Sequence, residues 1–261
     1  MTMPPPGELP RLSVVIPACN EADRLPPYLA AITKYLEYRA LRSEILVVDD
    51  GSTDSTATIV HRLSAETPVI RLLRLRRNLG KGGAVRAGVL AAEGELVLIA
   101  DADGATPIAE IERLEVELAN GADIAIGSRY LASRDARYHV QARWHRSVLG
   151  DIFNTLIQLL GLRGITDTQC GFKLLRRDVA RDLFSLGRID RYGFDLEILY
   201  IAQRRGYRIR EVPINWADQP GSKVRVLWDG LQMLADMVRV RRNHAQGLYN
   251  PRPIASSAAS A

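Results

Sequence analysis

Short apolar runs alternate with helical patterns of hydrophobic residues over the first hundred residues of the chain. The apolar runs predict strands at residues 11–17, 44–48, 69–75 and 96–100. Apolar positions at helical spacing predict helices between them, at residues 23–39, 54–64 and 84–92. This β-α-β-α order predicts an α/β fold, with a mostly parallel, doubly wound sheet, flanking helices and right-handed crossovers.

The pattern is less regular in the second half of the chain. It predicts helices over residues 108–120, 148–162, 178–184, 194–205 and 226–240, and strands over residues 123–128 and 207–216. We expect disorder in the Pro-rich residues 1–10 and in the tail at residues 246–261. The remaining residues, 11–245, are long enough for one domain with a single large core.

The predicted strand at residues 96–100 stops on two carboxylates, Asp101 and Asp103. Open α/β sheets bind their ligands at the carboxyl ends of their strands. An Asp-x-Asp pair at such an end can hold Mg²⁺, which takes one or two carboxylates together with phosphate oxygens of a substrate. The alternative is a simple turn, because Asp and Gly are favoured turn residues.

Two further polar clusters follow predicted strands. Asp49 and Asp50 end the second strand, where their carboxylates suit either the base and ribose of a nucleotide or the backbone of a turn. Gly80-Lys81-Gly82-Gly83 follows the third strand and resembles a phosphate-binding loop, although it lacks the Walker A pattern. Because parallel strands end at one edge of a sheet, these clusters and Asp101 predict a nucleotide and metal site.

The region of residues 129–147 offers a second anion site. Arg129, Arg143 and Ser147 can bind a phosphate group, since arginine presents a fixed fork that matches phosphate oxygens. The alternative is solvated surface charge. Further along, Asp195 and Glu197 begin a predicted helix, where they are either partners of the helix dipole or a catalytic base.

Composition narrows the class of partner. The formal charge of +5 favours an anionic one, such as a phosphorylated substrate, a membrane surface or a nucleic acid. A nucleic acid is disfavoured, because the basic residues lie among acidic strand ends without an aromatic stripe for stacking. Cys19 and Cys170 have no second Cys or His at metal-ligand spacing, which argues against structural zinc and a disulfide framework.

Taken together, these motifs resemble the inverting glycosyltransferases of family two, which have the GT-A fold, a Rossmann-like and mostly parallel sheet flanked by helices. The first half carries Val-Val-Ile-Pro17-Ala-Cys-Asn20-Glu21, Val-Val-Asp49-Asp50-Gly-Ser-Thr-Asp54, Asn78-Leu-Gly80-Lys81-Gly82 and Asp101-Ala-Asp103-Gly. The second half is similar to the dolichyl-phosphate β-glucosyltransferases, and next to polyprenyl-phosphate mannosyltransferases, in Gly127-Ser128-Arg129, Asp167-Thr-Gln169-Cys170-Gly171, Phe194-Asp195-x-Glu197 and Asn215-Trp216 followed by Gly221-Ser222-Lys223.

The resemblance implies transfer of glucose from UDP-glucose to a polyprenyl monophosphate of the dolichyl type, with inversion. It implies a nucleotide-binding half at residues 11–104 and an acceptor half at residues 105–245. The residues implied for the nucleotide sugar are Pro17, Asn20, Glu21, Asp49, Asp50, Lys81, Asp101 and Lys223. Asp101 and Asp103 would hold Mg²⁺ or Mn²⁺, and Arg129, Arg143 and Ser147 would bind the acceptor phosphate. The catalytic residues would be Asp103, Arg129, Arg143 and Asp195.

The sequence departs from the resemblance in one respect. Eukaryotic glucosyl enzymes of this type carry an N-terminal membrane anchor, and we find no apolar window here that is long enough to span a bilayer. We expect peripheral attachment to the cytoplasmic face of a membrane, through the helices predicted at residues 148–162 and 226–242. Both helices could instead pack in the core or in a dimer interface, so a homo-oligomer stays open.

Three functional alternatives also stay open. The donor could be GDP-mannose, as in the mannosyl relatives. The acceptor could be a molecule other than a lipid, and a neutral acceptor would have no use for a phosphate site at Arg143 and Ser147. The chain could also bind nucleotides without catalysis, in which case replacing Asp103 by Ala would leave the affinity for UDP-glucose nearly unchanged.

Overall fold

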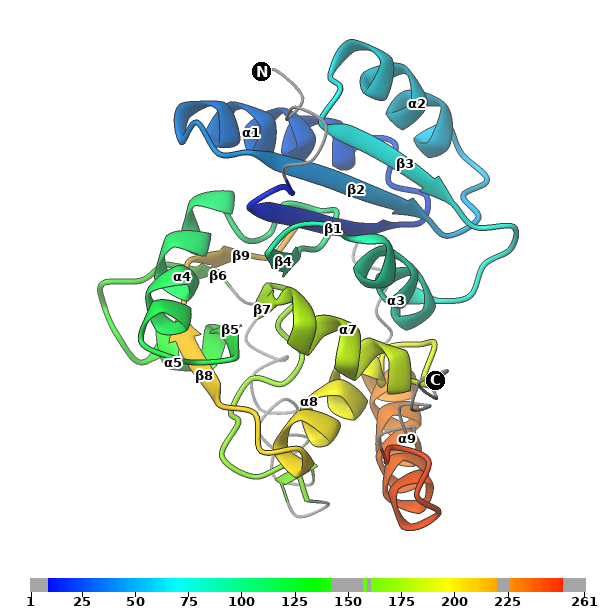
Figure 1. Cartoon of the computed structure of the whole chain (residues 1–261), viewed down its shortest axis with the longest axis vertical. Helices are drawn as coiled ribbons and strands as arrows, with labels where there is room; N and C mark the ends of the chain where they lie inside the picture. Colours follow the sequence, from blue (N-terminus) through cyan, green and yellow to red (C-terminus); the bar gives the residue numbers. More distant parts are fainter. Residues whose placement is uncertain (1–8, 142–156, 159–160, 220–225, 251–261) are drawn as a thin grey trace, which may run out of the picture.

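The computed structural model describes residues 9–141, 157–158, 161–219 and 226–250 (Figure 1). Within these residues one seven-stranded sheet has the order β3-β2-β1-β4-β7-β5-β8. Its strands are β1 (Leu12–Ala18), β2 (Ser43–Asp49), β3 (Ile70–Arg74), β4 (Leu96–Ile99), β5 (Ile124–Ser128), β7 (Lys173–Arg176) and β8 (Ile209–Pro213). A second, two-stranded sheet pairs β6 (Val140–Gln141) with β9 (Trp216–Ala217).

Helices cover both faces of the large sheet because its strands are apolar on both sides. In β2, Ile45 and Val47 face one core while Leu46 and Val48 face the other, as the two-residue period of a strand requires. The first core also takes residues of α1 (Leu25–Tyr38), α2 (Thr56–Glu66) and α4 (Ile111–Ala119). The second takes residues of α3 (Lys81–Ala91), α7 (Arg177–Leu186), α8 (Phe194–Arg204) and α9 (Val226–Ala245).

The first four strands form the parallel, doubly wound part of the sheet that the sequence predicts. β1 pairs in parallel with β2 and with β4, and β2 pairs in parallel with β3. The chain therefore winds outward from β1 to β3 and then returns to place β4 on the other side of β1. Ligands bind at such a switch point, outside the carboxyl ends of the strands.

The second half adds strands in a different way. β7 lies between β4 and β5 and is antiparallel to both, whereas β8 is parallel to β5. The sheet is thus mixed but mostly parallel, and the expected fold class is confirmed. The late strand predicted over residues 207–216 is divided into β8 and β9, and a short helix, α5 (Arg129–Ser133), follows β5 without having been predicted.

Most of the helix predicted at residues 148–162 lies outside the described residues. Ile157 and Leu162, which are described, are fully buried in the core around α8. The described fold also continues past residue 245, since Tyr249 is buried against Glu197 of α8. No helix in the described part of the chain is both long enough and apolar enough to cross a membrane.

Candidate active site

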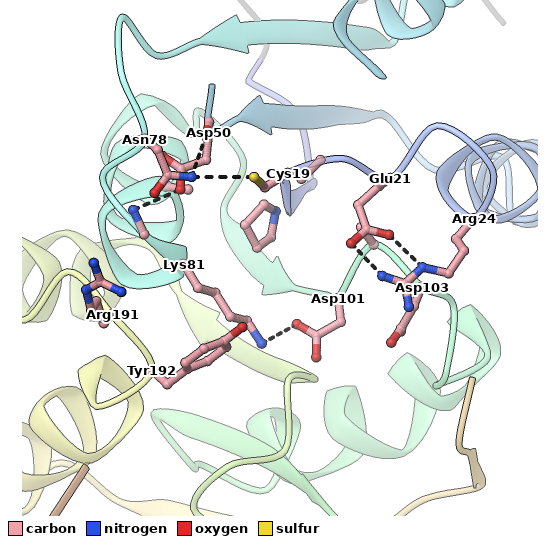
Figure 2. Close-up of a pocket in the computed structure, with 15 residues that line it drawn as sticks. Cys19, Glu21, Arg24, Asp50, Asn78, Lys81, Asp101, Asp103, Arg191 and Tyr192 are labelled. Carbon is pink, nitrogen blue, oxygen red and sulfur yellow. Dashed lines mark hydrogen bonds and ion pairs between the residues drawn. The ribbon is translucent and has the colours of Figure 1, made fainter. Parts of the chain in front are cut away.

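A pocket of about 280 Å³ lies where β1, β2 and β4 end (Figure 2). The end of β1, the loops after the first four strands and the start of α3 supply most of its lining: Pro17, Ala18, Cys19, Glu21, Arg24, Asp50, Asn78, Gly80, Lys81, Ala84, Asp101, Ala102 and Asp103. Arg191 and Tyr192, from the segment before α8, complete it. The polar strand ends therefore gather at one edge of the sheet, as the parallel order predicts.

An ion pair occupies the centre of the pocket. Lys81 begins α3 and places its Nζ 2.6 Å from Oδ1 of Asp101 (Figure 2). Burial opposes the charged form of this lysine, but the charges of Asp101 and Asp195 raise the pKa of Lys81 overall. Lys81 is therefore a permanent positive charge beside the carboxylates at the end of β4.

Asp103 lines the same pocket as Asp101. One oxygen of Asp103 accepts a hydrogen bond of 3.0 Å from the N–H of Ala105, within the turn after β4. Burial, followed by the neighbouring charge of Asp101, raises the pKa of Asp103. Two carboxylates that share a pocket and repel each other in this way form a site that a cation would stabilise.

The donor set of this pair fits a hard divalent cation. Mg²⁺ and Mn²⁺ both suit carboxylate oxygen, and Mg²⁺ commonly takes only one or two carboxylates plus phosphate oxygens. Among the described residues, no group of three or more His, Cys, Asp and Glu side chains is placed to hold a metal. A cation at Asp101 and Asp103 would accordingly complete its ligands with oxygens of a bound diphosphate.

The two aspartates after β2 have different surroundings. Asp50 lines the pocket, and its carboxylate accepts hydrogen bonds from the N–H groups of Leu79 and Gly80, at 2.7 and 2.8 Å. Asp49 is fully buried and accepts a bond of 3.1 Å from the N–H of Ser52. Asp49 does not line the pocket. The turn interpretation is therefore correct for Asp49, whereas Asp50 both shapes the pocket and faces it.

At the end of β1 and in the loop after it, some residues line the pocket and others hold neighbouring loops together. Pro17, at the end of β1, and Glu21, in the loop, line the pocket, and Glu21 binds Arg24 through both carboxylate oxygens, at 2.6 and 2.7 Å. Asn20 does not line it. The side-chain oxygen of Asn20 instead accepts hydrogen bonds from the N–H groups of Thr53, at 2.7 Å, and Asp54, at 3.3 Å. Asn20 thus joins the loops after β1 and β2.

The glycines around Lys81 have a packing role. The N–H of Gly80 donates to Asp50, and the N–H of Gly83 donates to the carbonyl of Asp190 at 3.0 Å. A Cβ atom on Gly82 would stand 2.6 Å from the carbonyl oxygen of Ile189. The interpretation of this loop as a phosphate cradle is therefore wrong for Gly80 and Gly83, because protein acceptors already take their N–H groups and the segment before α8 packs against them.

Arg129, the first residue of α5, is partly buried and forms an ion pair with the buried Asp167. Its Nε and Nη2 each lie 2.7 Å from an oxygen of Asp167, and its guanidinium stands 5.4 Å from the ring centre of Trp216. Despite the burial of Asp167, the Arg129 charge keeps the pKa of that carboxyl low. Arg129 is outside the lining of the pocket, yet the charge of Asp101 contributes to its raised pKa. Arg143, Ser147 and Lys223 lie outside the described residues.

Asp195 and Glu197 are both buried in α8, away from the pocket lining. Asp195 forms an ion pair of 2.5 Å with Lys173 of β7. Burial raises the pKa of Asp195 and outweighs the opposing charges of Lys173 and Lys81. Asp195 therefore lies outside the pocket lining and is paired with Lys173, and its catalytic role stays a prediction.

Sequence reasoning missed several residues of the pocket wall. Arg24, Arg191 and Tyr192 line it, and so does Asn78, which belongs to the motif Asn78-Leu-Gly80-Lys81-Gly82 but had been given no role in the site. Asn78 connects two loops, because its Nδ2 donates to the carbonyl of Asp50 at 2.9 Å. Arg191 and Tyr192 do not follow a strand, so the rule that ligands bind at strand ends does not predict them. The only signal in the sequence is their position just before the motif Phe194-Asp195-x-Glu197.

Comparison with known proteins identifies the family of this chain. Residues 13–184 match the model of glycosyl transferase family 2. The chain is 40% identical over 250 residues to a dolichyl-phosphate β-glucosyltransferase of Dictyostelium discoideum, with 91% of this chain and 76% of the relative covered. A dolichyl-phosphate β-glucosyltransferase of Mus musculus is 40% identical over 252 residues, with 92% and 77% covered.

A solved structure with a similar fold is that of glucosyl-3-phosphoglycerate synthase from Mycobacterium tuberculosis in complex with Mn²⁺ and UDP-glucose. The TM-score is 0.61 at 19% identity, with 91% of this chain and 79% of that chain covered. The GT-A fold expected from the sequence is thereby confirmed. By its sequence and its fold, the chain belongs to glycosyl transferase family 2 and is a homologue of the dolichyl-phosphate β-glucosyltransferases.

Proposed function

We propose that this chain transfers glucose from UDP-glucose to a polyprenyl monophosphate of the dolichyl type, with inversion at the anomeric carbon. The observation that carries the proposal is the pocket of Asp101, Asp103 and Lys81 at the switch point of the sheet. It occurs in a chain that aligns over about nine-tenths of its length with relatives named for this reaction.

The pocket has a nucleoside side and a charged side. The end of β1 supplies Pro17, and the loops after β2 and β3 supply Asp50 and Asn78, whose side-chain oxygen and nitrogen atoms suit the hydrogen-bonding groups of uracil and ribose. Asp101, Asp103 and Lys81 form the charged side. We assign the uridine of the donor to the first group and its diphosphate to the second.

Asp101 and Asp103 would hold the divalent cation, Mg²⁺ or Mn²⁺. When bound, the cation supplies positive charge that neutralises the leaving nucleoside diphosphate. Lys81 adds a second positive charge at the same place, because its ion pair with Asp101 points its ammonium group into the pocket (Figure 2). Both charges favour the state in which the bond between glucose and UDP is breaking.

The acceptor needs positioning more than activation. A phosphate monoester is already ionised at neutral pH, so its oxygen can attack the anomeric carbon without a strong general base, and the chain must align two anions that repel each other. We propose Arg129 for this role, together with Arg143 and Ser147. Asp167 and Trp216 hold the Arg129 guanidinium in one orientation, which lowers the entropic cost of positioning the phosphate.

We also propose that α9 attaches the chain peripherally to the cytoplasmic face of a membrane. Trp228, Leu231 and Val238 share one side of α9 and are 70%, 64% and 58% exposed, whereas Met237 and Val240 on the inner side are fully buried. Arg239, Arg241 and Arg242 are exposed near the C-terminal end of the helix. An apolar face with adjacent arginines is the pattern of a helix that lies in an anionic lipid interface.

One incubation tests the reaction. The purified chain is given a short polyprenyl phosphate and radiolabelled UDP-glucose or GDP-mannose, with added Mg²⁺ or Mn²⁺ or with EDTA. We expect a lipid-soluble glucosyl product that EDTA abolishes. Preference for GDP-mannose would overturn the donor, a product only with a water-soluble acceptor would overturn the lipid phosphate, and binding of UDP-glucose without any turnover would show a nucleotide-binding module.

A further inference from the structure

Arg191 differs from the other cations of the pocket. Arg24 binds Glu21, and Lys81 binds Asp101. The guanidinium of Arg191, by contrast, makes no hydrogen bond or ion pair with any residue that the structure describes, although it lines the same pocket. Arg191 stands on the other side of Lys81 from Asp101 and Asp103 (Figure 2). It is therefore a positive charge available to a ligand.

The backbone that carries Arg191 is anchored on both sides. Before it, the Glu197 carboxylate accepts hydrogen bonds from the N–H groups of Arg188 and Ile189, at 2.7 and 2.8 Å. The carbonyl of Asp190 accepts from Gly83 of α3, and the carboxylate of Asp190 binds Arg86. These contacts tie the segment to α3 and α8, which also support Lys81 and the core.

The other side of the segment meets α9. A Cβ atom on Gly193 would stand 2.5 Å from Oδ2 of Asp236, so α9 and this backbone are in close contact. Glu197 is further bound by the hydroxyl of Tyr249, at 2.6 Å, and that hydroxyl accepts from Asn243 of α9 at 3.0 Å. The backbone that carries Arg191 is thus held beside the pocket before any ligand arrives, which reduces the cost of binding one.

We propose that Arg191 binds the diphosphate of the donor, on the side of the pocket away from Asp103. This inference rests on the proposed function, because it deepens the assignment of the donor site. A nucleoside diphosphate brings several negative charges to a pocket whose lining already includes Glu21, Asp50, Asp101 and Asp103. Lys81 already forms an ion pair with Asp101, so the guanidinium of Arg191 brings a further positive charge to the pocket for the phosphate oxygens.

Binding of UDP, UMP and uridine in the presence of Mn²⁺ tests the proposal by calorimetry, without any need for turnover. The variants are Arg191→Ala and Arg191→Lys, with Arg188→Ala as the matched control. Arg188 is an exposed arginine of the same segment that does not line the pocket. We expect Arg191→Ala to weaken UDP binding about 10- to 100-fold and to leave uridine binding unchanged, since charged hydrogen bonds to phosphate are lost and contacts to the base are not.

Arg191→Lys should keep part of the UDP affinity, and Arg188→Ala should keep all of it. Unchanged thermal unfolding of the variants would exclude a general loss of structure as the cause. The proposal is overturned if Arg191→Ala binds UDP as well as the original chain does, or if it loses uridine and UDP binding equally. If the original chain binds no UDP, both the proposed donor and this inference are wrong. If the original chain and the Arg191→Ala variant bind UDP equally well, only the role of Arg191 is wrong.

Discussion

Gly171 lies directly against the carboxylate of Asp101. A Cβ atom added to Gly171 would overlap this carboxylate and stand only 2.6 Å from its Oδ1. The loop before β7 therefore forms the support that holds Asp101 toward Lys81, although the two residues are far apart in the sequence. Gly171 has no reactive group. It matters because the absence of a side chain leaves room for the carboxylate of Asp101.

Replacement of Gly171 by Ala should displace Asp101 and weaken its pairing with Lys81 and with a cation. We expect kcat to fall about 10-fold or more, equivalent to about 1.4 kcal/mol of transition-state stabilisation. The midpoint of thermal unfolding should change little in comparison. Gly230→Ala is the control, because a Cβ at that position in α9 would meet no described atom within 4 Å beyond the backbone of its own helix and its chain neighbours. Equal kcat values for the two variants would contradict the prediction.

Asp103 should be required for the effect of the metal on donor binding. Asp103→Asn keeps the size of the side chain but removes the charge that opposes Asp101 and attracts a cation. The affinity for UDP-glucose, measured by calorimetry with and without Mn²⁺, should lose most of its metal dependence, about 10-fold or more. Asp135→Asn, on an exposed loop outside the pocket, should behave like the original chain. A metal effect that survives Asp103→Asn would argue against this ligand.

The pair of Asp167 and Arg129 should contribute to stability in a pH-dependent way. The pKa of Asp167 is lowered in the folded chain, so its contribution is present above the unfolded pKa, near 4, and is lost as the pH falls through the folded value. We expect Asp167→Asn to lower the free energy of unfolding by about 2–4 kcal/mol at pH 7, because it leaves Arg129 without its partner. Urea unfolding should show a smaller difference below about pH 4. A difference that is independent of pH would contradict the assignment.

The two cysteines should differ sharply in reactivity. Cys170 is buried, and burial together with the charge of Asp167 raises its pKa to about 12. Cys19 lines the pocket and is partly exposed. In the folded chain at pH 8, iodoacetamide should modify Cys19 and spare Cys170, because the thiolate is the reactive form. Mass spectrometry of the peptides gives the measurement, and the denatured chain, in which both react, is the control.

Bound UDP-glucose should also protect Cys19 from iodoacetamide, since the donor would fill the pocket that this residue lines. Protection should require the divalent cation if Asp101 and Asp103 hold it together with the diphosphate. Modification of Cys19 at the same rate with and without UDP-glucose and Mn²⁺ would place the donor elsewhere.

The outer face of α9 should mediate membrane attachment. The chain should sediment with anionic vesicles at low salt and less at high salt, because charge attraction to lipid headgroups is screened by ions. Trp228→Ser combined with Leu231→Ser should abolish sedimentation, as it removes two exposed apolar groups from this face. Tyr38→Ser, at a residue of α1 that is 86% exposed, is the control. Sedimentation of the α9 variant with anionic vesicles would contradict the proposal.

The local pattern of apolar and polar residues was sufficient to predict much of the fold. The apolar runs located β1 to β4, and their alternation with helices predicted a parallel order that places Asp50, Lys81, Asp101 and Asp103 at one edge. Such patterns succeed because burial on one or both faces repeats along a strand or a helix with a regular period. The motif resemblance then indicated the family, and the alignments with relatives confirm it.

Contacts between segments that are distant in the sequence determine the remaining features of the fold and of the pocket. The antiparallel insertion of β7 between β4 and β5, the contact of Gly171 with Asp101 and the arrival of Arg191 in the pocket all join segments that are distant along the chain. Asp49 and Asp50 are adjacent and chemically identical, yet only Asp50 faces the pocket. The period of the apolar residues indicates which residues are buried. Which residue each buried group contacts depends on the tertiary packing of distant segments, and only the three-dimensional structure shows it.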